Sequence, residues 1–355
     1  MKRLTLVSLV LLAAFLVSAC GTAGSTASWP GLAADSERVY LASGQFVYAV
    51  RISDGTKVWQ YPDKAGPQLF YSPPVLTPDG QLLVGSSGTD FSLTSLDPAT
   101  GQTKWVGPFV AANHWVAPPL VEGNTIFAAN NDGALYALEL ATGRMRWSLP
   151  LGGLLWGAPA TNGKLVFVAS LDHHLYAVDP SKQALAWKLD LGGSAPGTVS
   201  VSGDGSTVYV GSFGKKVLGV DAASGSVRWT ADVKDWVWGA PILASDTVFA
   251  ADIGGHIYSF GAPNGKNAWP DILPDGSITG SPLALTDGVL VATESGTVFA
   301  YDGAGSKLWD TVIGGKIYTA PVAAGDRIAV APTGTDFLLA ALDQNGKLLW
   351  KFTGK

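Results

Sequence analysis

Tryptophan recurs in this chain at a nearly constant interval, and this recurrence constrains the fold more than any other feature. Eight tryptophans are separated in turn by 46, 42, 40, 42, 40, 40 and 41 residues: Trp59, Trp105, Trp147, Trp187, Trp229, Trp269, Trp309 and Trp350. A glycine stands four residues before seven of them, and only Gln183, ahead of Trp187, departs from the rule. Such a period is typical of proteins assembled from repeated supersecondary units, here eight units of about 42 residues.

Each unit has the pattern of four short strands joined by tight turns. In the third unit, apolar segments at residues 117–121, 125–129, 134–138 and 144–149 alternate with turns that contain glycine. Middle segments such as 165–169 are apolar on both faces, so they must be covered on both sides. Four-stranded antiparallel sheets that repeat radially and cover one another predict an all-β fold, an eight-bladed β-propeller.

The repeat resembles the pyrroloquinoline-quinone (PQQ) type of propeller repeat over the whole mature chain. Its Leu-Tyr-Ala-x-Asp, Thr-Gly and tryptophan consensus stands here as residues 175–179, Thr142-Gly143 and Arg146-Trp147. The tryptophan–aspartate type does not fit, because Trp309-Asp310 is the only such dipeptide. We expect the eight tryptophans to be structural, each buried between adjacent blades. We also expect the preceding glycine to permit a left-handed turn, with a variant turn at Gln183.

The N-terminus has the pattern of a bacterial lipoprotein signal. Lys2 and Arg3 precede an apolar stretch at residues 4–19, which is short for a membrane span and typical of a secretory signal. The stretch ends in a sequence that resembles the lipobox, with Cys20 as the residue that would be lipidated. Lipid chains on Cys20 would make a stable anchor.

These features predict three segments and an exported protein. Residues 1–20 are the expected lipoprotein signal peptide with Cys20 as the lipidated residue, residues 21–28 a short tether, and residues 29–355 a single propeller. The membrane would be contacted through the lipid anchor only. In a cell with two membranes we expect the periplasmic side of the outer membrane, and in a cell with one the outer face of the cell membrane.

Composition and motifs exclude several classes of function. Without Lys2 and Arg3, 21 basic residues face 28 acidic ones, a charge of −7, and no basic run remains for nucleic acid. Cys20 is the only cysteine, so disulfides, zinc–thiolate sites and thiol nucleophiles are excluded. No histidine has metal-ligand spacing; the four are His114, His173, His174 and His256. We therefore expect no catalytic residues, no cofactor and no metal.

Aromatic residues mark one end of the predicted channel. Each unit's first strand carries a proline, and the position three residues earlier is aromatic in five units: Phe70, Trp115, Trp156, Trp238 and Tyr318. The other three units have Ala27, Gly193 and Thr279 there. Turns between second and third strands bring acidic residues to the same end: Asp90, Asp132, Asp172, Glu294 and Asp336. The aromatics are a candidate partner-binding rim; the alternative is that they plug the channel.

The lipid anchor, the eight blades and the length are similar to those of the BamB lipoproteins of the outer-membrane barrel-assembly machinery. This resemblance implies a non-enzymatic interaction scaffold whose partner is an envelope protein, a barrel-assembly component in a cell with two membranes. Two alternatives stay open: a PQQ-dependent dehydrogenase-like protein, and a carbohydrate- or peptidoglycan-binding module. We also expect the ring to close blade against blade, because the first unit has its own Trp59 and the last reaches Trp350.

Overall fold

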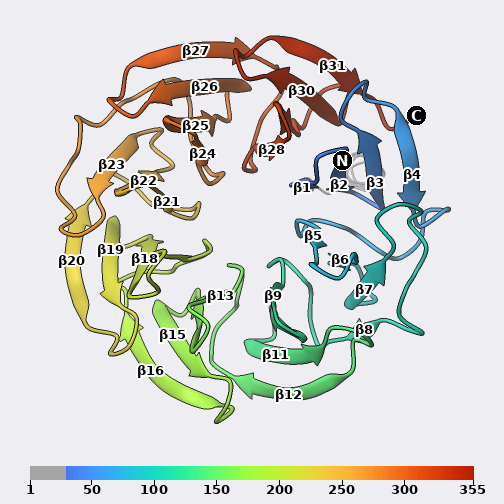
Figure 1. Cartoon of the computed structure of the whole chain (residues 1–355), viewed down its shortest axis with the longest axis horizontal. Coiled ribbons are helices and arrows are strands. Elements are labelled where there is room, and N and C mark those ends of the chain that lie inside the picture. Colours follow the sequence, from blue (N-terminus) through green and yellow to red (C-terminus); the bar gives the residue numbers. More distant parts are fainter. Residues whose placement is uncertain (1–28) are drawn as a thin grey trace, which may run out of the picture.

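The computed structural model describes residues 29–355 and shows eight β-sheets arranged as a ring around a central axis (Figure 1). The predicted all-β, eight-bladed propeller is confirmed. Residues 1–28, with the expected signal peptide, Cys20 and tether, lie outside the described residues. Residues 29–355 contain no helix with the length and hydrophobicity of a membrane span.

Each blade is an antiparallel meander whose strands follow one another in sequence order, with the first strand innermost (Figure 1). Blades 1 to 4 contain β1 (Gly31–Ala34), β2 (Arg38–Ser43), β3 (Phe46–Arg51), β4 (Lys57–Tyr61), β5 (Val75–Leu76), β6 (Leu82–Gly85), β7 (Ser92–Leu96), β8 (Phe109–Val110), β9 (Leu120–Glu122), β10 (Thr125–Ala129), β11 (Ala134–Glu139), β12 (Met145–Pro150), β13 (Ala160–Thr161), β14 (Val166–Ala169), β15 (His174–Asp179) and β16 (Ala184–Asp190). Blades 5 to 8 contain β17 (Ser200–Val201), β18 (Thr207–Ser212), β19 (Lys216–Asp221), β20 (Val227–Asp232), β21 (Ile242–Ala244), β22 (Thr247–Ala251), β23 (Ile257–Gly261), β24 (Leu283–Leu285), β25 (Gly288–Ala292), β26 (Thr297–Asp302), β27 (Lys307–Val312), β28 (Val322–Ala324), β29 (Arg327–Val330), β30 (Leu339–Asp343) and β31 (Leu348–Phe352).

Blade 6 departs from the four-strand rule that the other seven blades follow. Its sheet contains only β21, β22 and β23. The next segment takes the outer position through two isolated bridges, from Asn267 to Phe260 and from Ile272 to Ile257. Pro270 lies between the two bridges, and because proline has no N–H it interrupts the hydrogen-bond ladder there.

The innermost strands are shorter than the sequence pattern predicts. The structure begins β9 at Leu120 and not at residue 117, because Pro118 and Pro119 have no N–H to donate to β10. Second strands behave as expected: β10 has the bounds predicted for it, and all four residues of β14 are buried, as a strand covered on both faces requires.

Each repeat tryptophan packs against the turn of the next blade, and this contact explains the period. Indole N–H groups donate to backbone carbonyls of the next blade over 2.9–3.1 Å in six blades, from Trp59, Trp105, Trp187, Trp229, Trp309 and Trp350. A Cβ on the glycine of that turn would lie no more than 3.0 Å from the same ring in seven blade pairs. Gln183 also has a positive φ, 53°, so it keeps the left-handed conformation without glycine. The variant turn expected at Gln183 is therefore not observed.

The rest of the repeat consensus has equally local reasons. Trp229 pairs with Gly219, where a Cβ would collide with the indole, and five other blades place alanine opposite the tryptophan. The aspartate that follows caps the next turn: Asp179 accepts hydrogen bonds from the N–H groups of Ser181 and Lys182. The Tyr-Ala-x-Asp motif is therefore a packing and turn motif.

Eight hydrophobic clusters lie between neighbouring blades, and the one between blades 8 and 1 closes the ring. The Trp350 indole donates to the carbonyl of Ile52 at 2.9 Å. The Arg327 guanidinium donates to the carbonyls of Ile52 and Ser53 at 2.9 and 2.7 Å. Within the described residues, the ring closes blade against blade, as expected.

Candidate functional site

One residue from each blade lines the channel at the end where the chain enters the innermost strand. In seven blades this residue stands four positions before the first residue of the innermost strand, and in blade 1, whose strand begins earlier, it stands two positions before. In blade order the residues are Trp29, Tyr71, Val116, Trp156, Pro196, Trp238, Thr279 and Tyr318. They enclose a cavity of about 220 Å³, which we call the mouth cavity, and its end of the propeller is the mouth face.

Four of these side chains contact one another over the axis. Trp29 stacks on Tyr318 with 5.5 Å between ring centroids and meets Trp238 edge to face at 5.4 Å. The Trp238 ring lies 6.3 Å from that of Trp156. Blades 1, 8, 6 and 4 therefore meet over the channel. The rings fill part of the channel and leave the mouth cavity between them.

The aromatic contacts continue outward from the mouth cavity to solvent. Phe213 lies 5.3 Å from Trp238 and stacks on Trp236, with 4.8 Å between centroids. Trp236 is 44% exposed. In the cavity wall, the buried hydroxyl of Thr319 has no hydrogen-bond partner among the described residues. The site is thus apolar and aromatic, with one buried polar atom unmatched.

Two residues expected in the rim do not line the channel. Phe70 and Trp115 stand one position before Tyr71 and Val116, and both are buried in the clusters between blades. The corresponding residues of five other blades are buried in the same way: Leu155, Ala195, Val237, Ile278 and Ile317. The Trp115 indole N–H donates to the carbonyl of Phe91 at 2.8 Å. The side chains of successive residues in an extended chain point to opposite sides. A residue that lines the channel is therefore preceded by one that is buried between blades.

The reason for this difference is a pair of adjacent prolines. Blades 2 and 3 contain Pro73-Pro74 and Pro118-Pro119, and in both it is the second proline that directly precedes the innermost strand. Counting three residues back from the second proline would have identified Tyr71 and Val116. In blade 5 the innermost strand begins four residues after Pro196, so Pro196 itself takes the channel position and Gly193 does not.

The remaining rim positions are placed as follows. Trp156, Trp238, Thr279 and Tyr318 line the mouth cavity, where the sequence register had put them. Ala27 lies outside the described residues, and Trp29 takes the position in blade 1. The sequence pattern did not identify Trp29, because it stands one residue before Pro30 and the aromatic position was expected three residues before each proline.

The acidic residues of the turns do not line the mouth cavity. Asp90, Asp132 and Asp172 accept hydrogen bonds within their own blades, from Ser92 at 2.6 Å, from Tyr136 at 2.6 Å and from Tyr176 at 2.5 Å. Burial and the bond to its aspartate raise the pKa of each of the two tyrosine hydroxyls. None of the five expected acids, Glu294 and Asp336 included, lines the cavity. The expected acidic rim is therefore absent from the wall of the site.

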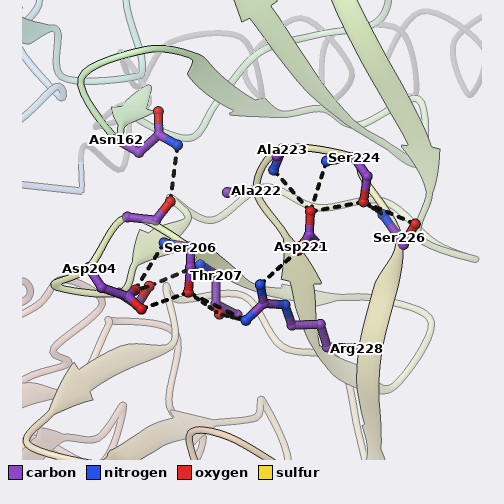
Figure 2. Close-up of polar contacts among 12 residues, drawn as sticks. Asn162, Asp204, Ser206, Thr207, Asp221, Ala222, Ala223, Ser224, Ser226 and Arg228 are labelled. Atoms are coloured by element: carbon purple, nitrogen blue, oxygen red, sulfur yellow. Dashed lines mark hydrogen bonds and ion pairs between the residues drawn. The ribbon is translucent and has the colours of Figure 1, made fainter.

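A second cavity, of about 460 Å³, lies between blades 5 and 6 at the opposite face and contains charged groups (Figure 2). The Arg228 guanidinium donates to Asp221 at 2.7 Å and to Thr207 at 2.8 Å. It lowers the pKa of the Asp221 carboxyl, and hydrogen bonds from Ser202 and Ser206 lower the pKa of Asp204 to about 2. Both carboxylates are ionised at neutral pH, so neither has a proton to give.

The Arg228 arrangement recurs in blade 3 and so belongs to the repeat. There Arg146 donates to Thr125 at 2.9 Å and lies 3.9 Å from Glu139. These residues occupy the positions of Thr207 and Asp221 in blade 5. An arrangement shared by two blades indicates a structural role.

The side chains of residues 29–355 form no cluster of metal ligands, and those of the mouth cavity do not suit a quinone cofactor. No group of three or more His, Cys, Asp or Glu side chains converges on one point there. His174 and His256 lie beside Asp172 and Asp252 of their own turns, at 3.5 and 3.1 Å. PQQ is a polycarboxylate, and no Lys or Arg lines the mouth cavity. The residues of the site do not fit that cofactor.

The fold and the site together define an eight-bladed propeller of PQQ-like repeats with an aromatic cavity at one end. The family model described as outer membrane protein assembly factor BamB matches residues 17–189, 175–277 and 254–355, and the chain belongs to this family. No curated protein matches the sequence.

Two solved structures share the fold. The crystal structure of BamB from Moraxella catarrhalis is 18% identical, with a TM-score of 0.72 over 85% of this chain and 92% of that one. The computationally designed Ika8 protein is 14% identical, with a TM-score of 0.71 over 91% of this chain and 95% of its own. At these identities the likeness concerns the fold alone.

Proposed function

We propose that the protein is a lipid-anchored, non-enzymatic scaffold of the cell envelope that binds a protein partner at the mouth cavity. The observation that carries the proposal is the aromatic wall of that cavity, in which Trp29, Trp156, Trp238 and Tyr318 stand on a closed ring of blades. A cavity of about 220 Å³ accommodates a large apolar side chain of a partner. Hot spots of protein interfaces form where such an anchor is fully desolvated.

Membership of the BamB family supports the kind of partner. The family description names outer-membrane protein assembly, so in a cell with two membranes we propose a component of the barrel-assembly machinery. Lipidation of Cys20 would place the protein on the periplasmic side of the outer membrane. In a cell with one membrane, the partner would be another protein at the outer face of that membrane.

The test is the affinity of the purified, full-length protein for a purified barrel-assembly component. Trp156→Ala and Trp238→Ala each remove part of the cavity wall, and we expect each to weaken binding by about 30-fold, the equivalent of a 2 kcal/mol hot spot. Leu185→Ala, which removes an exposed apolar side chain from the outer strand β16, is the matched control and should bind normally.

Thermal unfolding of the same variants separates lost binding from lost stability. Unchanged affinity in both tryptophan variants, or an equal loss in Leu185→Ala, would contradict the proposal. Two further experiments test the alternative functions. Saturable muropeptide binding that depends on Trp156 and Trp238 would indicate a carbohydrate-binding module, and alcohol oxidation with added quinone would indicate a dehydrogenase.

A further inference from the structure

The chain enters the propeller at the centre of the mouth face. Trp29, the first described residue, stands in the wall of the mouth cavity between Tyr318 and Trp238, and β1 runs away from this face. Cys20 lies nine residues before Trp29, and an extended chain of nine residues spans at most about 32 Å. A lipid on Cys20 would therefore hold the mouth cavity within about this distance of a bilayer surface.

So short a tether does not allow the opposite face to meet the bilayer. To reach that face around the outside, the segment between Trp29 and Cys20 would first have to cross the four strands of a blade, about 14 Å at the usual strand spacing. It would then have to run the length of a six-residue strand, about 20 Å, and the two distances together already exceed its reach. The distance from the axis to the innermost strand comes in addition. The rings of Trp29, Trp156, Trp238 and Tyr318, which meet over the axis, obstruct the way through the channel. The mouth face or the rim beside it must face the bilayer.

Large apolar side chains are exposed on one side of the mouth face. Leu154, Trp236, Leu273 and Val312 are 40%, 44%, 61% and 71% exposed, and we call them the apolar arc. They precede β13, β21 and β24 or end β27, elements that occupy one half of the ring (Figure 1). Among residues 29–355, Val110 is the other exposed large apolar side chain at this end of the strands.

The chemistry of the apolar arc suits a lipid headgroup region. Stacking on Phe213 fixes the indole of Trp236, and tryptophan is the side chain most typical of membrane–water interfaces together with tyrosine. The neighbouring cations are paired, Lys234 with Asp271 at 2.5 Å and Lys215 with Asp235 at 3.5 Å. Neither lysine is therefore free to pair with an anionic headgroup, and the contact with lipid would depend on the apolar side chains themselves.

We propose that the apolar arc rests on the bilayer and that its side chains enter the headgroup region. The propeller then stands tilted, with the side of blades 4 to 7 against lipid and the mouth cavity open toward blades 1 to 3. The inference rests on the proposed anchor at Cys20. Four side chains alone bind a membrane weakly, and the tether supplies the high effective concentration that makes the contact persist.

The test uses the lipidated, full-length protein in vesicles of phosphatidylethanolamine and phosphatidylglycerol. Cys20 is the only natural cysteine, and lipidation consumes its thiol, so Leu273→Cys introduces a unique site for a nitroxide label. Lys266→Cys, exposed in the turn between β23 and the outer segment of blade 6, is the matched control on the opposite face. We expect collisions with a water-soluble nickel chelate to be at least about threefold rarer at residue 273 than at residue 266 when the label lies among headgroups.

A second variant tests whether the arc acts as a unit. A label at Val312→Cys should be protected in the otherwise natural chain and become water-exposed when Trp236→Ser and Leu273→Ser are added. Equal chelate accessibility at residues 273 and 266 in floated vesicles would overturn the lipid contact and leave the anchor intact. Failure of the protein to float would overturn the anchor itself. Protection at residue 273 only after a protein partner is added would assign the arc to that protein and overturn the inference.

Discussion

A repeat tryptophan and the glycine of the next blade form the contact that sets both the sequence period and the spacing of the blades. The Trp187 ring occupies the place that a side chain at Gly225 would need, and the indole N–H donates to the carbonyl of Ala222 in the same turn. Glycine is required there for space, and it also adopts the φ of 75° without strain. Gln183 shows that the positive φ alone does not require glycine.

Gly225→Ala should lower the free energy of unfolding by about 2 kcal/mol or more, since it adds a left-handed alanine and a collision with the Trp187 ring. Gln183→Gly is the matched control. It keeps a φ that glycine adopts without strain and adds backbone entropy to the unfolded chain, so we expect a change below about 1 kcal/mol. Urea unfolding measures both, and equal losses would contradict the packing role of the glycine.

Blade 6 shows how an element can lose its regular form and keep its place in the ring. Pro270 interrupts the outer strand, yet Trp269 stays buried between blades 6 and 7. Its indole nitrogen is buried without a hydrogen-bond partner among the described residues. In blade 5 the indole of Trp229 donates to the carbonyl of Ala262 at 2.9 Å. The two tryptophans therefore share their burial and differ in one hydrogen bond.

Trp229→Phe should destabilise the protein by about 1 kcal/mol more than Trp269→Phe, because only the first substitution breaks a hydrogen bond. Both substitutions remove a similar apolar volume from a blade interface, so each serves as the control of the other. Chemical unfolding with both variants gives the difference. A larger loss of unfolding free energy in Trp269→Phe would contradict the conclusion that its indole nitrogen has no hydrogen-bond partner.

On the scale of the whole molecule, we expect the propeller to fold independently of the proposed anchor. The described chain has no cysteine, and the interface of blades 8 and 1 closes the ring through packing, Trp350 and Arg327. These closing contacts lie within residues 29–355. Folding should therefore not depend on lipidation.

Cys20→Ser should move the protein from the membrane fraction to the soluble fraction with an unchanged thermal midpoint. Removal of the lipid takes away the anchor energy of the acyl chains, about 0.8 kcal/mol per buried CH₂, and no contact within residues 29–355. Fractionation and thermal unfolding of the two forms check the prediction. A variant that stays with membranes, or one that unfolds, would show that Cys20 has a different role.

The sequence alone was enough to predict the number of blades, their strand order and the way the ring closes. These properties depend on turn geometry and on contacts between neighbouring units, so every unit repeats the same signals. The contact that closes the ring is formed by Trp350 of the last unit and Gly55 of the first, and both residues follow the repeat pattern. The irregular outer edge of blade 6 follows from Pro270. The sequence pattern did not predict this irregularity, because Trp269 lies at the regular repeat position.

The composition of the mouth was decided by tertiary structure. Trp115 and Val116 are adjacent in sequence, yet one is buried between blades and the other lines the cavity, because a shift of one residue in an extended chain reverses the direction of the side chain. The carboxylate of Asp132 does not line the channel, because it accepts a hydrogen bond from the hydroxyl of Tyr136, four residues away in the same blade. Trp29 joins the site only through Tyr318 and Trp238, residues more than two hundred positions away along the chain. Local signals repeat eight times, but the side chains that meet on the axis come from different blades, and only the closed ring brings them together.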